Sequence, residues 1–179
     1  GASVAAILVA GPSCLSAMKD DWLSLKLSAP LELRKKLAAK AWLSEDFLER
    51  RWDSHPVRPA FDASREAVLL HGHCHQKALW GIQTSAALLK RIAGDAIKVL
   101  DTGCCGMAGS FGYTRERFAL SNQIGELVLF PALRAAPGAT VCAPGTSCRH
   151  QIHDGVQRDA IHPMELVRKL MRPGRGAKS

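Results

Sequence analysis

Four of the six cysteines stand in three short segments that lie tens of residues apart along the chain. Cys74 occurs in HGHCHQ, Cys104 and Cys105 occur in TGCCGMAG, and Cys148 occurs in GTSCRHQ. Four thiolates can bind a tetrahedral Zn²⁺ or the four irons of a cubane cluster. This spacing is unlike the close Cys-x-x-Cys pairs of zinc fingers or the compact run of bacterial ferredoxins. A shared site therefore requires the fold, rather than one loop, to bring the sulfurs together.

The residues beside these cysteines suit a metal centre better than a disulfide. Neighbouring cysteines such as Cys104 and Cys105 bond to each other only with strain, and no Cys-x-x-Cys redox motif is present. The glycines of TGCCGMAG would let the backbone pass close to a bulky cluster and offer N–H groups to its sulfurs. Cys148 begins a predicted helix, whose dipole favours the thiolate.

Three histidines, His71, His73 and His75, surround Cys74. Histidine is the commonest metal ligand, and its pKa lies near neutrality. These side chains could act as ligands or proton relays beside a cluster, or only form hydrogen bonds at a crowded strand end. Of the three, we take His73 and His75 as candidate metal ligands.

Short apolar runs that end at Gly, Pro or polar residues alternate with helical patterns along the chain. The runs predict buried strands at 5–11, 67–73, 96–101, 139–145 and 159–163. Helices are expected from 13 onward and at 30–43, 44–52, 76–92, 116–133, 147–156 and 164–171, with Ser44 as an N-cap. This alternation indicates an α/β fold with a mainly parallel sheet flanked by helices.

In such sheets, ligands bind beyond the carboxyl ends of the strands. All but one of the cysteines follow a predicted strand end and could converge on one edge, namely Cys14, Cys74, Cys104, Cys105 and Cys148. Cys142 lies inside a predicted strand and is expected to be a small buried hydrophobe.

The segments Ala5–Asp20 and Ala139–Asp154 resemble each other, since both read strand, Gly-x-Ser-Cys, then helix. We interpret residues 1–63 as the end of a first repeat with a helical connector and 64–172 as a complete second repeat. Residues 173–179 are expected to form a disordered tail. Because the chain opens on an apolar run without Met, we expect it to be part of a longer protein.

The composition restricts the function classes. The formal net charge is +8, but the basic residues fall on a predicted helix face and in the tail, and aromatic residues make up 6% of the chain. Nucleic acid is therefore not an expected partner. No apolar stretch approaches the roughly 20 residues of a membrane span, and no signal peptide is recognisable. We expect a cytoplasmic protein that meets membranes only through its partners.

Three segments carry a resemblance to a known family: HGHCHQKAL, DTGCCGMAGSFGY and GTSCRHQI. They resemble the cysteine-rich CCG domain of iron–sulfur oxidoreductases, which occurs in heterodisulfide reductase B and in the iron–sulfur subunits of glycolate oxidase. The similarity is strongest to the carboxy-terminal part of fused FAD-linked oxidases, such as D-2-hydroxyglutarate and D-lactate dehydrogenases. The resemblance implies electron transfer through an iron–sulfur cluster of the 4Fe-4S type.

The chain departs from the family pattern at one ligand position. The family motif ends in Cys-x-x-Cys, but Gly145 stands where the first of these cysteines belongs, and Gly11 stands there in the earlier half-repeat. This departure argues against a five-cysteine cluster and leaves Cys74, Cys104, Cys105 and Cys148 as ligands. Cys14 could be a substitute ligand or belong to a second site that the missing half completes.

The resemblance implies that FAD belongs to the parent protein and that an FAD-containing oxidase domain and other iron–sulfur domains are the partners. The substrate would be a 2-hydroxy acid such as D-lactate, glycolate or D-2-hydroxyglutarate. We expect no dehydrogenase activity from this chain alone. The alternative is a structural or interaction module of the same complex that binds zinc, or no metal.

Overall fold

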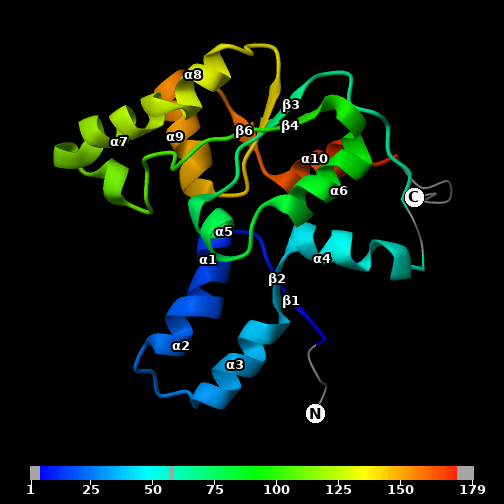
Figure 1. Ribbon diagram of the computed structural model, residues 1–179, viewed down its shortest axis with the longest axis vertical. Coiled ribbons are helices and arrows are strands. Elements are labelled where there is room, and N and C mark those ends of the chain that lie inside the picture. The colour runs from blue at the N-terminus through cyan, green and yellow to red at the C-terminus, as the bar shows by residue number, and fades with distance from the viewer. Residues whose placement is uncertain (1–4, 57–58, 173–179) are drawn as a thin grey trace, which may run out of the picture.

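The computed structural model describes residues 5–56 and 59–172 (Figure 1), so the expected tail at 173–179 lies outside the described residues. The main sheet has four parallel strands in the order β4-β3-β5-β6. Their bounds are Val68–Leu70 for β3, Ile97–Val99 for β4, Thr140–Cys142 for β5 and Ala160–Ile161 for β6. The α/β class with a parallel sheet is thereby confirmed.

Helices cover both faces of this sheet (Figure 1). They are α5 (Cys74–Leu79), α6 (Gln83–Ala93), α7 (Arg115–Leu127), α8 (Leu129–Arg134), α9 (Thr146–Val156) and α10 (Pro163–Leu170). Leu69 of β3 packs with α8 and α9, whereas its neighbours Val68 and Leu70 pack with α6 and α10. This alternation follows from the two-residue period of a strand, and it explains why β3 is apolar on both faces.

A smaller parallel sheet lies beside the main one and is formed by β1 (Ile7–Val9) and β2 (Ala41–Leu43). Between these strands run α1 (Pro12–Ser16), a π-helical turn (Ala17–Asp21), α2 (Trp22–Ser24) and α3 (Leu31–Lys40), and α4 (Ser44–Arg51) follows β2. Single 3₁₀ turns lie at Trp52–Ser54, Gly94–Ala96 and Phe111–Tyr113. The order β1, α1, β2, α4 parallels the order β5, α9, β6, α10, in agreement with the repeat predicted from the sequence. The domain boundaries remain predictions.

Several predicted elements differ from the structure. Residues 41–43 form β2 rather than the end of a helix, because pairing with β1 buries Ala41 and Leu43 completely. Strand β1 is not a buried strand, since Leu8 is 53% exposed in this two-stranded sheet. Ser44 is the first helical residue, and Leu43 occupies the N-cap position without a side-chain hydrogen bond.

Two predicted long helices are each divided in the structure. The pattern at 76–92 contains α5 and α6, which are separated at Gly81, where the backbone adopts φ +80°. The pattern at 116–133 contains α7 and α8, which are separated at Val128. The apolar period continues across both breaks, so periodicity alone does not reveal them.

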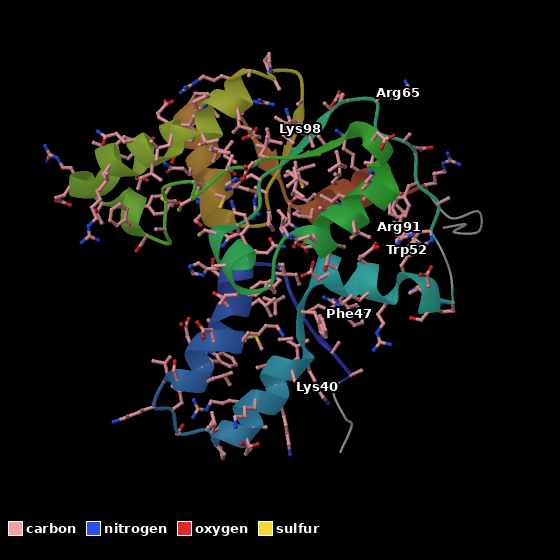
Figure 2. The ribbon with its side chains drawn as sticks, in the orientation of Figure 1. Lys40, Phe47, Trp52, Arg65, Arg91 and Lys98 are labelled. Atoms are coloured by element: carbon pink, nitrogen blue, oxygen red, sulfur yellow. The ribbon has the colours of Figure 1, made fainter. Side chains whose placement is uncertain are left out.

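Side chains of α4 and α6 join the two sheets' helices. Arg91 makes a bidentate ion pair with Glu49, with N–O distances of 2.7 and 3.0 Å, and its guanidinium lies 5.3 Å from the Trp52 ring centroid (Figure 2). Ser85 donates to Asp46 of α4 at 2.8 Å and accepts from Gln76 of α5 at 2.8 Å. Within the described residues, no helix is long and apolar enough to cross a membrane.

Candidate metal centre

The structure brings the four separated cysteines into one group beyond the carboxyl ends of β3, β4 and β5. Cys74 contacts Cys104, Cys104 contacts Cys105, and Cys105 contacts Cys148 through side-chain hydrogen bonds. Cys105 and Cys148 are buried, whereas Cys74 and Cys104 are half-buried. The parallel topology explains this convergence, because each cysteine segment leaves the sheet at the same edge.

The thiols of this group share protons. Hydrogen bonding from Cys105 is the main cause that lowers the pKa of Cys104 and the pKa of Cys148. Donation to Cys104 is the main cause that raises the pKa of Cys74 and the pKa of Cys105. Two thiolates are thus stabilised by two neighbouring thiols. Metal ions displace such protons and bind the thiolate forms, so the donor set suits a cation of soft character.

The loop that carries Cys104 and Cys105 depends on Gly106. This residue adopts φ +99°, and a Cβ atom on it would lie 2.0 Å from the Ser121 carbonyl oxygen of α7. The Gly106 N–H donates to Sγ of Cys104 at 3.3 Å. The residue therefore supplies both the left-handed turn and a hydrogen bond to a sulfur, as expected from the sequence.

A cavity of about 240 Å³ lies at this edge of the sheet. Helix α1 contributes Ser13 to its wall, and the start of α9 contributes Ser147. These are the two serines of the repeated Gly-x-Ser-Cys motif. The remaining lining residues come from α5 and the glycine-rich loop and are His73, Cys74, His75, Cys104, Cys105, Ala108 and Gly109. Cys14 is exposed and does not line this cavity.

His73 uses both ring nitrogens in hydrogen bonds. Its Nδ1 accepts from the backbone N–H of His75 at 3.2 Å, so its Nε2 carries the proton and donates to Oγ of Ser13 at 3.2 Å. Burial lowers the pKa of His73, which favours this neutral form. In this arrangement His73 caps α5 and attaches α1 to the site.

His75 is exposed and bonds to the same helix. The Ser16 hydroxyl donates to the Ser13 carbonyl oxygen at 2.8 Å, so it accepts from Nδ1 of His75, which lies 2.8 Å away. The Nε2 atom of His75 then carries a lone pair. His73 and His75 are the candidate ligands expected from the sequence, and of these two only His75 keeps an available nitrogen.

His71 lies deeper than either of these residues. A ring nitrogen of His71, Sγ of Cys105 and Sγ of Cys148 all lie within 4.8 Å of one another, and all three residues are buried. The sequence marks His71 as one of the flanking histidines but does not single it out as a ligand. The available signal was its place at the end of an apolar strand, the same edge where the cysteines were expected.

Two basic side chains hold the loops around the site. Lys77 donates to the carbonyl oxygens of Thr102 and Gly103. Arg149 donates to the carbonyl oxygens of Ala143 and Pro144, each at 3.0 Å. Both cations therefore stabilise the segments between the strands and the cysteines.

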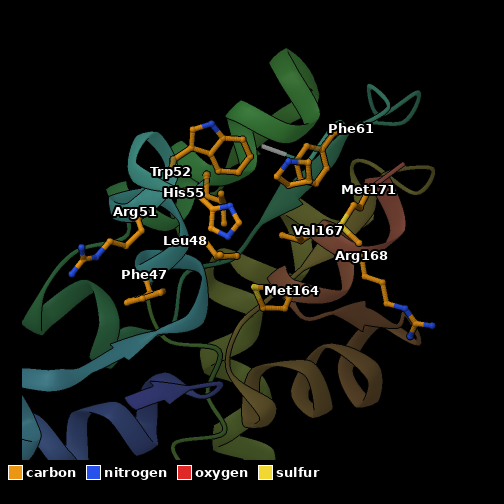
Figure 3. A pocket seen from close by; sticks show the side chains of 12 residues that line it. Phe47, Leu48, Arg51, Trp52, His55, Phe61, Met164, Val167, Arg168 and Met171 are labelled. Atoms are coloured by element: carbon orange, nitrogen blue, oxygen red, sulfur yellow. The ribbon is translucent and has the colours of Figure 1, made fainter. Parts of the chain in front are cut away.

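A second cavity, of about 330 Å³, lies between α4 and α10 (Figure 3). Its wall is mainly apolar and includes Leu48, Trp52 and Phe61. Arg51 and Arg168 border it, but Figure 3 shows both side chains pointing away from its centre. No cysteine lines this cavity, and its wall does not offer the converging polar groups of a specific site.

These features define a parallel α/β domain with a thiol-rich candidate metal centre at the carboxyl ends of its strands. The chain is similar to one of the subunits of anaerobic glycerol-3-phosphate dehydrogenase, the one designated C, from Escherichia coli (strain K12). The identity is 24% over 165 residues, which are 92% of this chain and 40% of that protein. The chain thus spans well under half the length of this curated relative.

D-2-hydroxyglutarate dehydrogenases are also similar to the chain. The protein from Escherichia coli (strain K12) is 28% identical over 131 residues, which are 73% of this chain and 13% of that protein. The protein from Pantoea ananatis (strain AJ13355) is 30% identical over 109 residues, which are 60% of this chain and 11% of that protein. No family model matches the chain. No solved structure matches it.

Proposed function

We propose that this chain is the iron–sulfur, electron-transfer domain of a larger FAD-linked 2-hydroxy-acid oxidoreductase of the CCG type. The observation that carries this proposal is the unbroken contact of Cys74, Cys104, Cys105 and Cys148 at one edge of the sheet. Four soft sulfur donors fit an iron–sulfur cluster or zinc better than magnesium or calcium.

The protein around these sulfurs also fits a cluster. The backbone N–H of Gly106 points to Cys104, and backbone N–H groups of His75 and Met107 lower the pKa of Cys74 and of Cys105. Such hydrogen bonds to sulfur stabilise negative charge and tune reduction potential. A bound cluster would accept and release electrons. The residues of this chain would hold it and limit the access of water through the cover that α1 provides.

The relatives support an electron-transfer role over substrate recognition. They are named as dehydrogenases of two different substrates, glycerol 3-phosphate and D-2-hydroxyglutarate. A segment related to both is better explained by a step that the two reactions share. We therefore propose that a flavin-containing oxidase domain oxidises the substrate, and that electrons pass through this domain and other iron–sulfur domains. We also propose that the domain resides in the cytoplasm.

The second candidate is a zinc-binding structural module of the same complex. It is favoured by the compactness of His71, Cys105 and Cys148, whose ligand atoms lie within 4.8 Å of one another and so could surround a single ion. Zinc and iron both accept thiolate ligands, so the donor types suit either metal.

Anaerobic purification tests the two candidates directly. Iron with acid-labile sulfide and broad visible absorption supports the cluster, whereas stoichiometric zinc without colour supports the structural module. Dye reduction that depends on a 2-hydroxy acid is expected only when the flavin partner is added. Activity of this chain alone would contradict the electron-transfer proposal.

A further inference from the structure

One buried nitrogen atom at the thiol group has no partner. The backbone N–H of His71 donates to the Cys142 carbonyl oxygen at 2.9 Å, which continues the pairing of β3 with β5. The side chain is 1% exposed, and its Nε2 atom forms no hydrogen bond. Buried polar atoms in proteins are almost always paired, so an unpaired nitrogen beside sulfur donors points to a missing ligand.

The His71 ring is oriented by a hydrogen bond from its other side. Its Nδ1 lies 2.7 Å from Oγ1 of Thr102, which precedes the cysteine loop. When Nδ1–H donates to the hydroxyl, Nε2 carries the lone pair that a metal requires. Metal-binding histidines commonly donate their second nitrogen to a fixed oxygen in this manner.

We propose that His71 is a nitrogen ligand of the metal centre and binds through Nε2 beside the Cys105 and Cys148 thiolates. This inference rests on the proposed function, and it changes the donor set from four sulfurs to four sulfurs and one nitrogen. The 4.8 Å limit among the three ligand atoms allows one metal ion to reach all of them. A neutral imidazole adds less negative charge than a thiolate, so this ligand favours a higher reduction potential.

The neighbouring histidines do not offer an equivalent atom. Both nitrogens of His73 are used in hydrogen bonds to His75 and Ser13. His75 is exposed, and its Nδ1 is bonded to Ser16. The three residues therefore give a matched set in which one ring is placed to bind metal and two hold α1.

The test uses protein purified anaerobically after selective ¹⁵N labelling of histidine. Pulsed electron paramagnetic resonance of the reduced protein is expected to show a ¹⁴N coupling in unlabelled protein that becomes a ¹⁵N coupling after labelling. The coupling should disappear in His71→Ala and persist in His73→Ala. Circular dichroism of each variant reports folding, and the measurement on labelled wild-type protein depends on no substitution.

Each outcome separates this inference from the proposed function. An iron–sulfur signal without histidine coupling, or a coupling that persists in His71→Ala, would overturn the ligand assignment and leave the cluster proposal standing. Protein that contains zinc alone would be substituted with Co²⁺ and examined in the same way. In that case the cluster proposal fails, while a histidine coupling lost in His71→Ala supports the ligand. Protein that binds neither metal overturns both.

Discussion

His73 occupies the space that a side chain at position 145 would need. A Cβ atom on Gly145 would lie 2.4 Å from Cδ2 of His73 and 3.0 Å from Sγ of Cys148. The glycine at this position, which departs from the family motif, thus has a structural reason in this chain. It makes room for the imidazole that caps α5 and contacts α1.

We expect Gly145→Ala to displace His73 and to lower the free energy of unfolding by about 1–3 kcal/mol, as overpacking of a dense site does. Urea unfolding followed by circular dichroism measures the change. Gly138→Ala is the matched control, because a Cβ atom there has no neighbour within 4 Å. Equal stability of the two variants would show that His73 is not held as described.

Three glycines of the cysteine loop should differ in their tolerance of alanine. Gly106 combines φ +99° with a Cβ distance of 2.0 Å to a carbonyl oxygen, whereas Gly109 has φ +70° and open space. Gly103 has neither constraint. We expect losses of stability above about 2 kcal/mol for Gly106→Ala, about 1 kcal/mol for Gly109→Ala and little change for Gly103→Ala. Thermal and urea unfolding of the three variants give the order, and a different order would contradict the loop geometry.

The sequence allowed the main sheet and the gathering of the cysteines to be predicted for the same reason. The apolar runs around Val68–Leu70 and Thr140–Cys142 are bounded by Gly, Pro and polar residues, and strands that alternate with helices form parallel sheets. Once the strands are parallel, the segments that follow them must meet at one edge. No distance between cysteines had to be known for this conclusion.

Features that depend on distant contacts were not predictable. Strand β2 follows a run of good helix formers, and it becomes a strand because Leu43 pairs with Val9 far back along the chain. The orientation of His71 depends on Thr102, which arrives from β4. Local patterns contain neither relationship, so a nearer pair of histidines attracted the ligand prediction.

Glu45 predicts a pH dependence of stability. Its side chain is fully buried in α4, and neither carboxylate oxygen has a hydrogen-bond partner. Burial raises the pKa of Glu45 from 4.5 to about 7. The folded state therefore keeps a proton that the unfolded state has lost, so the free energy of unfolding falls as pH rises from 4.5 through 7. The shift corresponds to a contribution of about 3 kcal/mol, at about 1.4 kcal/mol per pKa unit.

We expect Glu45→Gln to be more stable than the wild type above neutral pH and to lose this advantage in acid. Urea unfolding at a series of pH values gives the difference between the two proteins. Comparing this difference removes the separate effect of Asp46, whose pKa burial also raises. The same exchange at exposed Glu116 is the control, and a variant difference that does not depend on pH would contradict the assignment.

Serine substitutions at two buried cysteines distinguish a metal site from ordinary core packing. Cys148 belongs to the thiol group, whereas Cys142 lies in β5 among the apolar residues of α6 and α10 and is fully buried. We expect Cys148→Ser to lose bound metal, because a hydroxyl at neutral pH cannot replace a thiolate ligand.

Cys142→Ser should keep its metal but unfold more easily, by about 1–3 kcal/mol, because it places an additional polar group in an apolar region. Metal analysis after anaerobic purification, together with urea unfolding of both variants, separates the two effects. If both variants retained metal equally, the cysteines at the sheet edge would be core residues like Cys142. Metal loss in Cys148→Ser alone requires that its sulfur acts together with those of the neighbouring loops, since packing is disturbed at least as much by serine in β5.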